Sequence, residues 1–382
     1  MTQAALARLG VRHNSAKAPG AGSCTVPTVH PATNPATTQR FDLSPARLPP
    51  GYFALVMATG IVSVGCQLRG WTLVSRVMLG LTAAEYAVLV VLTVWRIVAH
   101  RRELAADAHD TRKAFLFFTF VAGTGVLSVG LAGQGQLLTA TVLFAIAGLA
   151  WVVLGYTIPW SAVLSRSERP VVAAANGTWF VWVVASQSVA VAAATLEPHS
   201  AGLRPGLAIV AVFAWSVGCV LYAASAVFVS LRLMLYTVDP RELDPPYWVS
   251  MGAVAITVVA GARIVEMESA PMVDAVRGLV AGLAVVFWCF ATWLIPVLVA
   301  AGVWRHRVHR VPLTYDPTWW SIVFPFGMYA VAGTYLGRAD NLPIVEWIGE
   351  SWLWIALTAW VIAFAAMLRS LLVRTPGDPE RA

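Results

Sequence analysis

Charged residues are scarce in this sequence. Asp, Glu, Lys and Arg make up 12% of the 382 residues, and 58% of the residues are hydrophobic. An ordinary soluble protein has about 25% charged residues and 45–50% apolar residues. The apolar residues also come in long blocks. This composition argues against a soluble globular protein and predicts a polytopic membrane protein.

Motifs for catalysis and for metal binding are also scarce. The chain has four cysteines without a CxxC motif or a paired spacing, so we expect neither a disulfide framework nor a zinc site. His306 and His309 have a spacing that allows metal binding, but histidine and arginine are expected at the cytoplasmic end of a membrane helix. We find no glycine-rich phosphate loop, paired carboxylates or nucleophile-and-base motif. No metal or other cofactor is therefore expected, and an integral-membrane enzyme is kept only as the alternative from another class.

Apolar runs of about 20 residues, long enough to cross roughly 30 Å of hydrocarbon, recur along the chain. They are continuous, whereas barrel strands alternate, so they predict helices. The chain should therefore have a disordered cytoplasmic tail (1–49), a ten-helix membrane domain (50–373) and a short cytoplasmic tail (374–382). The ten predicted helices are 51–68, 77–95, 115–132, 137–159, 171–194, 206–231, 247–265, 278–303, 319–337 and 352–373.

Basic residues concentrate on one side of these segments. With the N-terminus inside the cell, 20 of the 26 Lys and Arg residues lie on the cytoplasmic side. The positive-inside rule then places both termini in the cytoplasm, as an even number of crossings requires, and we expect the plasma membrane as the location. The basic residues flank helices and do not form one face, so the net charge of +7 does not indicate nucleic-acid binding.

One short motif occurs twice. TGIVSVG at Thr59–Gly65 and TGVLSVG at Thr124–Gly130 begin 65 residues apart. The two copies fall in the first and third apolar segments, which cross the membrane in the same direction. This repeat predicts five helical hairpins related by an axis along the membrane normal. A ring of five such hairpins would surround a central pore lined by the odd-numbered helices.

Small and uncharged polar residues concentrate in the odd-numbered segments, which favours pore lining. The alternative is ordinary packing, since small residues are common wherever membrane helices touch. The candidate lining residues are Thr59, Gly60, Ser63, Thr124, Gly125, Ser128, Gly177, Thr178, Gln187, Thr257, Gly327 and Gly333.

Glu85 lies near the centre of the second segment. A charge at that depth costs about 2.5–3.5 kcal/mol on insertion scales, so the carboxyl group is a candidate for proton coupling to transport. The alternative is a neutral acid that is hydrogen-bonded between helices. We favour this structural role, because even-numbered helices should form the outer layer.

Three stretches resemble a known family. They are PPGYFALVMATGIVSVG (Pro49–Gly65), NGTWFVWVVASQSVAV (Asn176–Val191) and WWSIVFPFGMYAVAGTYLG (Trp319–Gly337). They are similar to the tellurite-resistance/dicarboxylate transporter family, which includes TehA-type proteins, yeast malate permeases and plant slow anion channels. The resemblance implies ten helices in five hairpins, a homotrimer with one pore per protomer, and a small anion as the substrate.

The nature of the anion is left open by the residues. A tight dicarboxylate site would use an arginine clamp, and the pore segments carry none at mid-depth. Arg263 lies near the outer end of the seventh segment, where it can extend to the interface. The motifs are closest in style to transporters of organic anions, including C4-dicarboxylates. The alternatives are a passive voltage-driven channel for chloride, nitrate or sulfite, and a tellurite-resistance exporter.

The ninth segment contains a candidate gate. Pro325 removes a backbone donor, so a bend is expected there. The preceding ring of Phe324 can then close a pore by steric block and by excluding water. The resemblance implies a pore-occluding Phe on this helix, and the FP of the motif matches Phe324. Phe326 lies roughly 200° around the helix and should not share that face. The alternative is that Phe324 simply packs against a neighbouring helix.

Overall fold

The structure, a computed structural model, describes residues 44–161, 170–268 and 270–372. The predicted tails therefore lie outside the described residues, apart from positions 44–49. Every regular element in the described ranges is helical. This confirms the predicted all-α membrane class.

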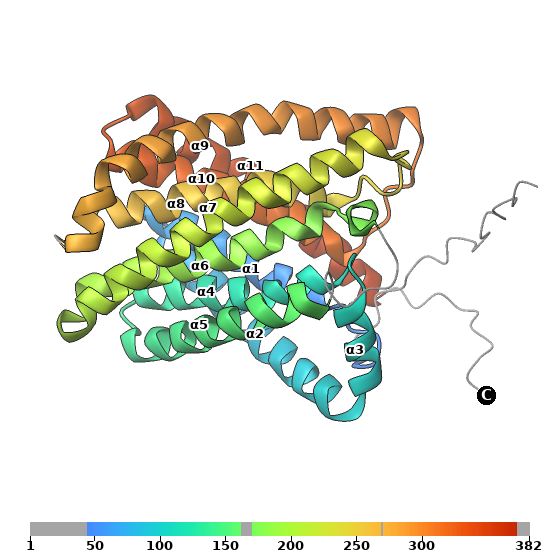
Figure 1. Cartoon of the computed structure of the whole chain (residues 1–382), viewed down its shortest axis with the longest axis horizontal. Helices are drawn as coiled ribbons and strands as arrows, with labels where there is room; N and C mark the ends of the chain where they lie inside the picture. Colours follow the sequence, from blue (N-terminus) through green and yellow to red (C-terminus); the bar gives the residue numbers. More distant parts are fainter. Residues whose placement is uncertain (1–43, 162–169, 269, 373–382) are drawn as a thin grey trace, which may run out of the picture. The chain divides into compact units, whose positions relative to one another are not determined.

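In the part of the chain that the structure describes, ten long helices form five hairpins, and in each hairpin the first helix packs against the second. The first members, which we call the inner helices, are α1 (Ala54–Leu68), α4 (Phe118–Gly133), α6 (Phe180–Leu196), α8 (Val249–Val265) and α10 (Trp320–Ala339). The second members, the outer helices, are α2 (Thr72–Ala99), α5 (Leu137–Pro159), α7 (Arg204–Leu235), α9 (Pro271–Val303) and α11 (Pro343–Leu372). A short helix that the sequence did not predict, α3 (Arg101–His109), connects α2 to the second hairpin (Figure 1).

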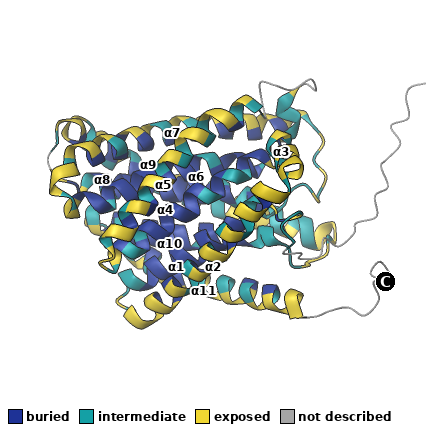
Figure 2. Cartoon of the chain, turned by 90° about the horizontal axis from the view of Figure 1, so that it is seen from below, coloured by how far each residue is buried: buried dark blue, intermediate teal, exposed yellow. Residues whose placement is uncertain are grey.

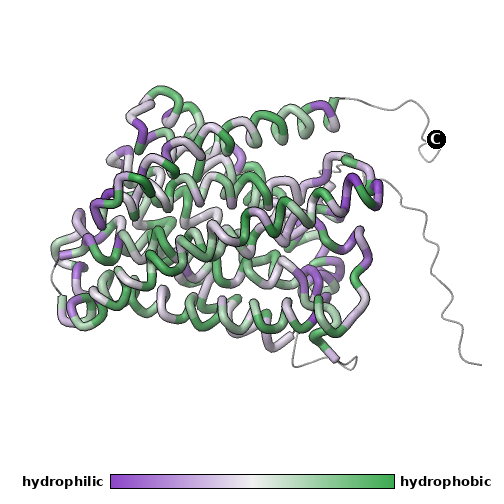
Figure 3. Tube along the Cα trace, turned by 90° about the horizontal axis from the view of Figure 1, so that it is seen from above, coloured by the Kyte–Doolittle hydropathy of each residue, from purple (hydrophilic) through white to green (hydrophobic). Residues whose placement is uncertain are grey.

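Burial separates the two sets of helices (Figure 2). In the most apolar stretches of α1, α4, α6 and α8, 72–89% of the residues are buried, against 17–39% in the outer helices. The exposed side chains of the outer helices include many large apolar ones, such as Leu73, Val91, Trp293 and Trp347. Hydrophobic residues run along the helices, and hydrophilic ones gather near their ends (Figure 3). The outer helices are therefore suited to contact lipid.

Nine helices in the described ranges are long and apolar enough to cross a membrane, and α10 is not among them. The sequence had predicted a tenth crossing here. The helix α10 contains Pro325, three glycines, one tryptophan and two tyrosines, which lower its mean hydropathy. It packs against α1, α8 and α11, and most of its residues are buried. Because protein surrounds this helix, it does not need the hydropathy of a lipid-facing one.

The inner helices contact one another in sequence: α1 with α4, α4 with α6, α6 with α8, α8 with α10, and α10 with α1. Glycines permit four of these contacts, since an added Cβ would lie 2.6–3.0 Å from an atom of the neighbouring helix. The pairs are Gly60 with Val126, Gly125 with Ser188, Gly252 with Pro325, and Gly327 with Ile61.

A 3₁₀ turn rich in aromatic residues precedes every inner helix. The five turns are η1 (Pro50–Phe53), η2 (Ala114–Phe117), η5 (Gly177–Trp179), η8 (Pro245–Trp248) and η10 (Pro317–Trp319). Each turn contacts the next, and η10 contacts η1. We call this set the aromatic collar. It joins the inner helices at their N-terminal ends.

The repeated motif has a structural role within the hairpins. The Ser63 hydroxyl donates to the carbonyl oxygen of Ser75 at 2.7 Å, and the Ser128 hydroxyl donates to that of Ala140 at the same distance. Both bonds join an inner helix to its own outer helix across 12 residues. The serine of the motif therefore connects the two helices of its hairpin.

Candidate functional site

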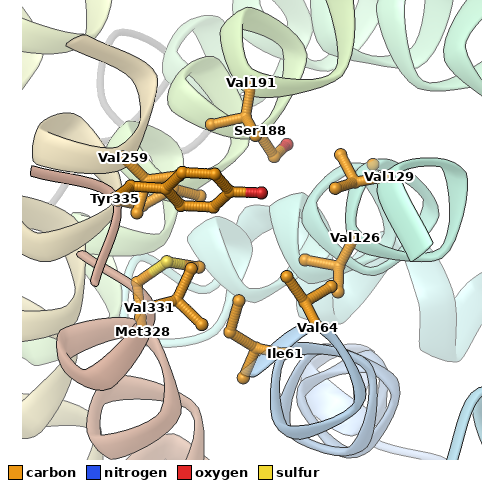
Figure 4. Close-up of a pocket in the computed structure, with 12 residues that line it drawn as sticks. Ile61, Val64, Val126, Val129, Ser188, Val191, Val259, Met328, Val331 and Tyr335 are labelled. Atoms are coloured by element: carbon orange, nitrogen blue, oxygen red, sulfur yellow. The ribbon is translucent and has the colours of Figure 1, made fainter. Parts of the chain in front are cut away.

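A narrow cavity lies between the five inner helices (Figure 4). Every inner helix contributes to its wall. The lining residues are Ile61, Val64, Gly125, Val126, Val129, Ser188, Val191, Ile256, Val259, Met328, Val331 and Tyr335. We call this space the central cavity.

The wall of the central cavity is uncharged and mostly apolar. Its two hydroxyl groups belong to Ser188 and Tyr335. The Ser188 hydroxyl donates to the carbonyl oxygen of Ala185 at 2.8 Å, and the Tyr335 ring points into the cavity with its hydroxyl foremost (Figure 4). Such a wall can let an ion pass but offers little to hold it tightly.

A wider pocket adjoins the cavity at the C-terminal ends of the inner helices. The two spaces share Val64, Val129 and Tyr335. The remaining lining residues of the wider pocket are Gln67, Leu68, Ala132, Gly133, Thr195, His199 and Arg263. We call this pocket the vestibule. It carries basic and amide groups next to the uncharged cavity.

Most of the polar residues predicted to line a pore form hydrogen bonds to other parts of the bundle. Of the twelve candidates, Gly125 lines the central cavity. The hydroxyl of Thr59 donates to Glu85, that of Thr124 lies 3.1 Å from the Tyr86 hydroxyl, and the Gln187 amide donates to the Trp215 carbonyl. Ser63 and Ser128 make the hairpin bonds described above. The Thr178 hydroxyl donates to the Asn176 side chain, and the Thr257 hydroxyl donates within its own helix.

The predicted glycines mostly serve close packing. Gly60 and Gly327 each receive a side chain of the next inner helix, as described above. An added Cβ at Gly177 would lie 2.4 Å from the backbone of η8, and one at Gly333 would lie 2.8 Å from Gly349 of α11. Polar and small residues satisfy helix contacts in a membrane bundle. This packing explains why such residues did not mark the cavity wall.

The apolar residues of the cavity wall, which the sequence did not predict, follow a pattern that can be found in the sequence. Each inner helix places two lining residues three positions apart, and the first two pairs are Ile61 with Val64 and Val126 with Val129. The 65-residue offset of the repeat relates these pairs. The third and sixth letters of the motif therefore face the cavity.

The gate candidate lies just beyond the central cavity. Phe324 is 1% exposed and precedes Met328 by one helical turn, on the side of α10 that also presents Val331 and Tyr335 to the cavity. Phe326 points elsewhere, since its ring makes edge contacts with Trp248 at 5.0 Å and Trp352 at 6.1 Å. Phe324 therefore continues the cavity-facing row toward the aromatic collar.

Glu85 takes part in a contact between α1, α2 and α11. Its Oε1 accepts a hydrogen bond from the Thr59 hydroxyl at 3.2 Å, and the same hydroxyl accepts one from the Trp360 indole at 3.1 Å. Neither Glu85 nor its two partners line the central cavity. This arrangement favours the structural role of Glu85 over proton coupling at the site of passage.

Comparisons with known proteins show which family the chain belongs to. The family model described as a voltage-dependent anion channel, SLAC1, matches residues 47–368. An uncharacterized membrane protein of Mycobacterium tuberculosis is 60% identical over 151 residues, which cover 40% of this chain and 77% of that protein. Two uncharacterized transporters of Methanocaldococcus jannaschii are 24% and 21% identical, over 82% and 81% of this chain and 90% and 91% of theirs. The family match runs from just before the first 3₁₀ turn into the last helix, so the chain belongs to the SLAC1 family of anion channels and transporters.

Proposed function

We propose that the protein conducts small anions passively across the plasma membrane, through the central cavity. The observation that carries this proposal is that all five inner helices contribute to one uncharged cavity, which widens into a vestibule containing Arg263. A weak site lets an ion leave as readily as it enters, as conduction requires. The described residues of both linings include no acidic side chain, which favours anions over cations.

The linings also bear on which anions pass. A dicarboxylate held tightly would use two cationic groups or a bidentate arginine at each carboxylate. Among the described residues, no such group lines the central cavity, and Arg263 is the one arginine that lines the vestibule. We therefore favour chloride, nitrate or a similar small anion. A carrier for C4-dicarboxylates is the second candidate, based on the motif resemblance, and a tellurite-resistance exporter is the third.

Phe324 is our candidate for the gate of this pathway. Its position one turn beyond Met328 would place the ring at the end of the cavity nearest the aromatic collar. Pro325 lowers the resistance of α10 to bending at this point. A small change in the bend would move the ring into or out of the path.

The proposed assembly is a homotrimer with one pathway in each protomer. The contacts among the five inner helices are completed within one chain, so the pathway does not need a neighbouring subunit. The apolar surfaces of the outer helices are available for lipid and for other subunits.

A reconstitution experiment tests the proposed function. Purified protein in liposomes would be given a panel of chloride, nitrate, sulfite, malate and tellurite, first with an imposed voltage and then with an imposed pH gradient. Flux that follows voltage and ignores the pH gradient supports a passive channel, whereas flux that requires the pH gradient supports a proton-coupled carrier. The anions would be recovered afterwards, because chemical change in them would indicate an enzyme. No flux of any of these anions above that of protein-free liposomes would overturn the proposal.

A further inference from the structure

The two ends of the cavity differ in electrostatic potential. The five inner helices run parallel, with their C-terminal ends at the vestibule. Each helix C-terminus carries roughly half a negative charge on its free carbonyl groups. An anion that crosses this end therefore meets a repulsive backbone field, and a passage for anions needs positive charge there.

Arg263 supplies a permanent positive charge at this end. It lies in the last turn of α8, and it is the one Lys or Arg among the described residues that line the vestibule. Its guanidinium carbon is 5.3 Å from the centre of the Tyr335 ring, which also lines the central cavity. Arg263 is thus held beside the point where the vestibule narrows into the cavity.

Arg263 pairs with one carboxylate through part of its guanidinium group. Its Nη1 donates to Glu266 Oε2 at 2.5 Å, and the two side chains are 21% and 35% exposed. Its Nε is buried and has no hydrogen-bond partner among the described residues. Glu266 does not line the vestibule. The carboxylate therefore positions the arginine and lowers the local potential without standing in the path.

We propose that Arg263 is the anion-selecting residue of the vestibule and binds the permeating anion before it enters the central cavity. This inference rests on the proposed function. The ligand class is a small anion that accepts hydrogen bonds, since the guanidinium group donates them. Tyr335 orients the guanidinium by a cation–π contact, and its hydroxyl would meet the anion next.

Variants that neutralise one charge at a time test the proposal in planar bilayers. We would measure chloride conductance and the reversal potential in a KCl gradient for Arg263→Gln and Glu266→Gln. The matched control is Arg76→Gln, because Arg76 lies at the same end of the bundle and donates to Gln134 outside the vestibule lining. Each variant would be measured at low salt (about 0.01 M), where the Debye length is about 30 Å, and at high salt (about 1 M), where it is about 3 Å.

The two vestibule variants should act in opposite directions. At low salt, Arg263→Gln should lower chloride conductance about three- to fivefold and move the reversal potential toward that of potassium. Glu266→Gln should raise conductance, Arg76→Gln should leave it unchanged, and all differences should shrink at high salt. If Arg263→Gln fails to fold, the expected increase in chloride conductance of Glu266→Gln tests the same proposal. The proposal is wrong if, at low salt, each of the variants Arg263→Gln and Glu266→Gln that folds has the conductance and reversal potential of the wild type.

Bromide binding separates this inference from the proposed function. Crystals of the wild-type protein in bromide should show anomalous density beside Arg263, and Arg263→Gln crystals should not. Bound bromide in a protein that conducts no anion would retain the site and overturn the pathway. If neither Arg263→Gln nor Glu266→Gln changes conduction and no bromide binds beside Arg263, the proposed pathway stands and the proposed site at Arg263 is wrong.

Discussion

At the scale of single residues, Phe324 differs from the other aromatic residues of its helix. Among the described residues no aromatic ring packs against it, whereas the neighbouring Phe326 and Tyr329 both contact Trp352. It is nevertheless almost fully buried. The ring is therefore held by aliphatic packing and not by the aromatic contacts that fix its neighbours.

Removing the Phe324 ring should open the pathway. Phe324→Ala is expected to raise anion flux at least about tenfold, because a hydrophobic constriction blocks ions by excluding water. Phe326→Ala is the matched control and should leave flux near wild type, since that ring contacts Trp248 and Trp352 instead. The measurement is chloride and nitrate flux into liposomes. Equal flux in wild-type and correctly assembled Phe324→Ala protein would show that the gate assignment is wrong.

Asp244 gives the protein a pH-dependent stability. It immediately precedes the aromatic-collar turn η8, and burial raises its pKa to about 7, although the charge of Arg305 acts in the opposite direction and Asp316 and Glu242 reinforce the rise. The ordinary pKa of Asp is about 3.9, so the folded chain holds this proton more tightly than the unfolded chain. The stability from this group is therefore full below about pH 4 and is lost as the pH rises to about 7.

Asp244→Asn should remove that pH dependence. The variant should unfold at a higher temperature than wild type at pH 8, because it avoids a buried charge, and the difference should vanish near pH 4. Thermal unfolding in detergent from about pH 4 to pH 8 provides the measurement. Asp239→Asn is the control, since Asp239 is exposed. Parallel curves for wild type and Asp244→Asn would contradict the prediction.

At the scale of elements, the sequence predicted the hairpins better than it predicted the surfaces of their helices. Apolar runs located every long helix, but the last one begins at Pro343, nine residues before the predicted 352. In that added stretch Glu346 pairs with Arg338, and Glu350 pairs with Arg69. These acidic residues interrupt the apolar run in the sequence, but in the structure they belong to the helix. Hydropathy cannot show this, because the ion partners come from other parts of the chain.

The predicted pore-lining residues differ from the residues of the central cavity wall for a related physical reason. Hydroxyl groups and glycines suit an ion path, but they also suit the contact between two membrane helices. Ser63 and Ser128 serve that second purpose, and valines and isoleucines form most of the cavity wall. An apolar side chain in a membrane helix looks the same in sequence whether it faces lipid, protein or a cavity. Only the register of the repeat distinguishes these cases.

The contact between α10 and α11 should tolerate no added side chain. A Cβ at Gly349 would lie 2.5 Å from the Thr334 nitrogen and 2.7 Å from the Ala330 oxygen, and backbone atoms cannot rotate away. Gly349→Ala should therefore lower stability by about 1–3 kcal/mol. Gly282→Ala on α9 meets nothing within 4 Å and should leave stability equal or up to about 1 kcal/mol higher. Thermal unfolding in detergent compares the two, and equal losses would refute this account of the contact.

At the scale of the whole molecule, the two ends of the bundle carry different charge patterns. At the vestibule end, arginines are matched by acids, as in the pairs Arg69 with Glu350 and Arg204 with Glu268. At the aromatic-collar end, Arg101 and Arg102 are exposed on α3 in addition to paired basic residues such as Arg96. Applied to the Lys and Arg residues of the described ranges, the positive-inside rule favours a cytoplasmic collar and an outward-facing vestibule, and we propose this orientation.

Accessibility of engineered cysteines tests that orientation. In a background without the four native cysteines, Ala201→Cys and Ala106→Cys place thiols at exposed alanines, in the turn before α7 and in α3. A membrane-impermeant thiol reagent should label the Cys variant at 201 in intact cells, and the variant at 106 only after permeabilisation. The reverse pattern would place the vestibule in the cytoplasm and invert the direction in which Arg263 recruits anions. Labelling of both positions in intact cells would mean that the residues between them do not cross the membrane an odd number of times, and the assignment of α4, α5 and α6 as three successive crossings would then be wrong.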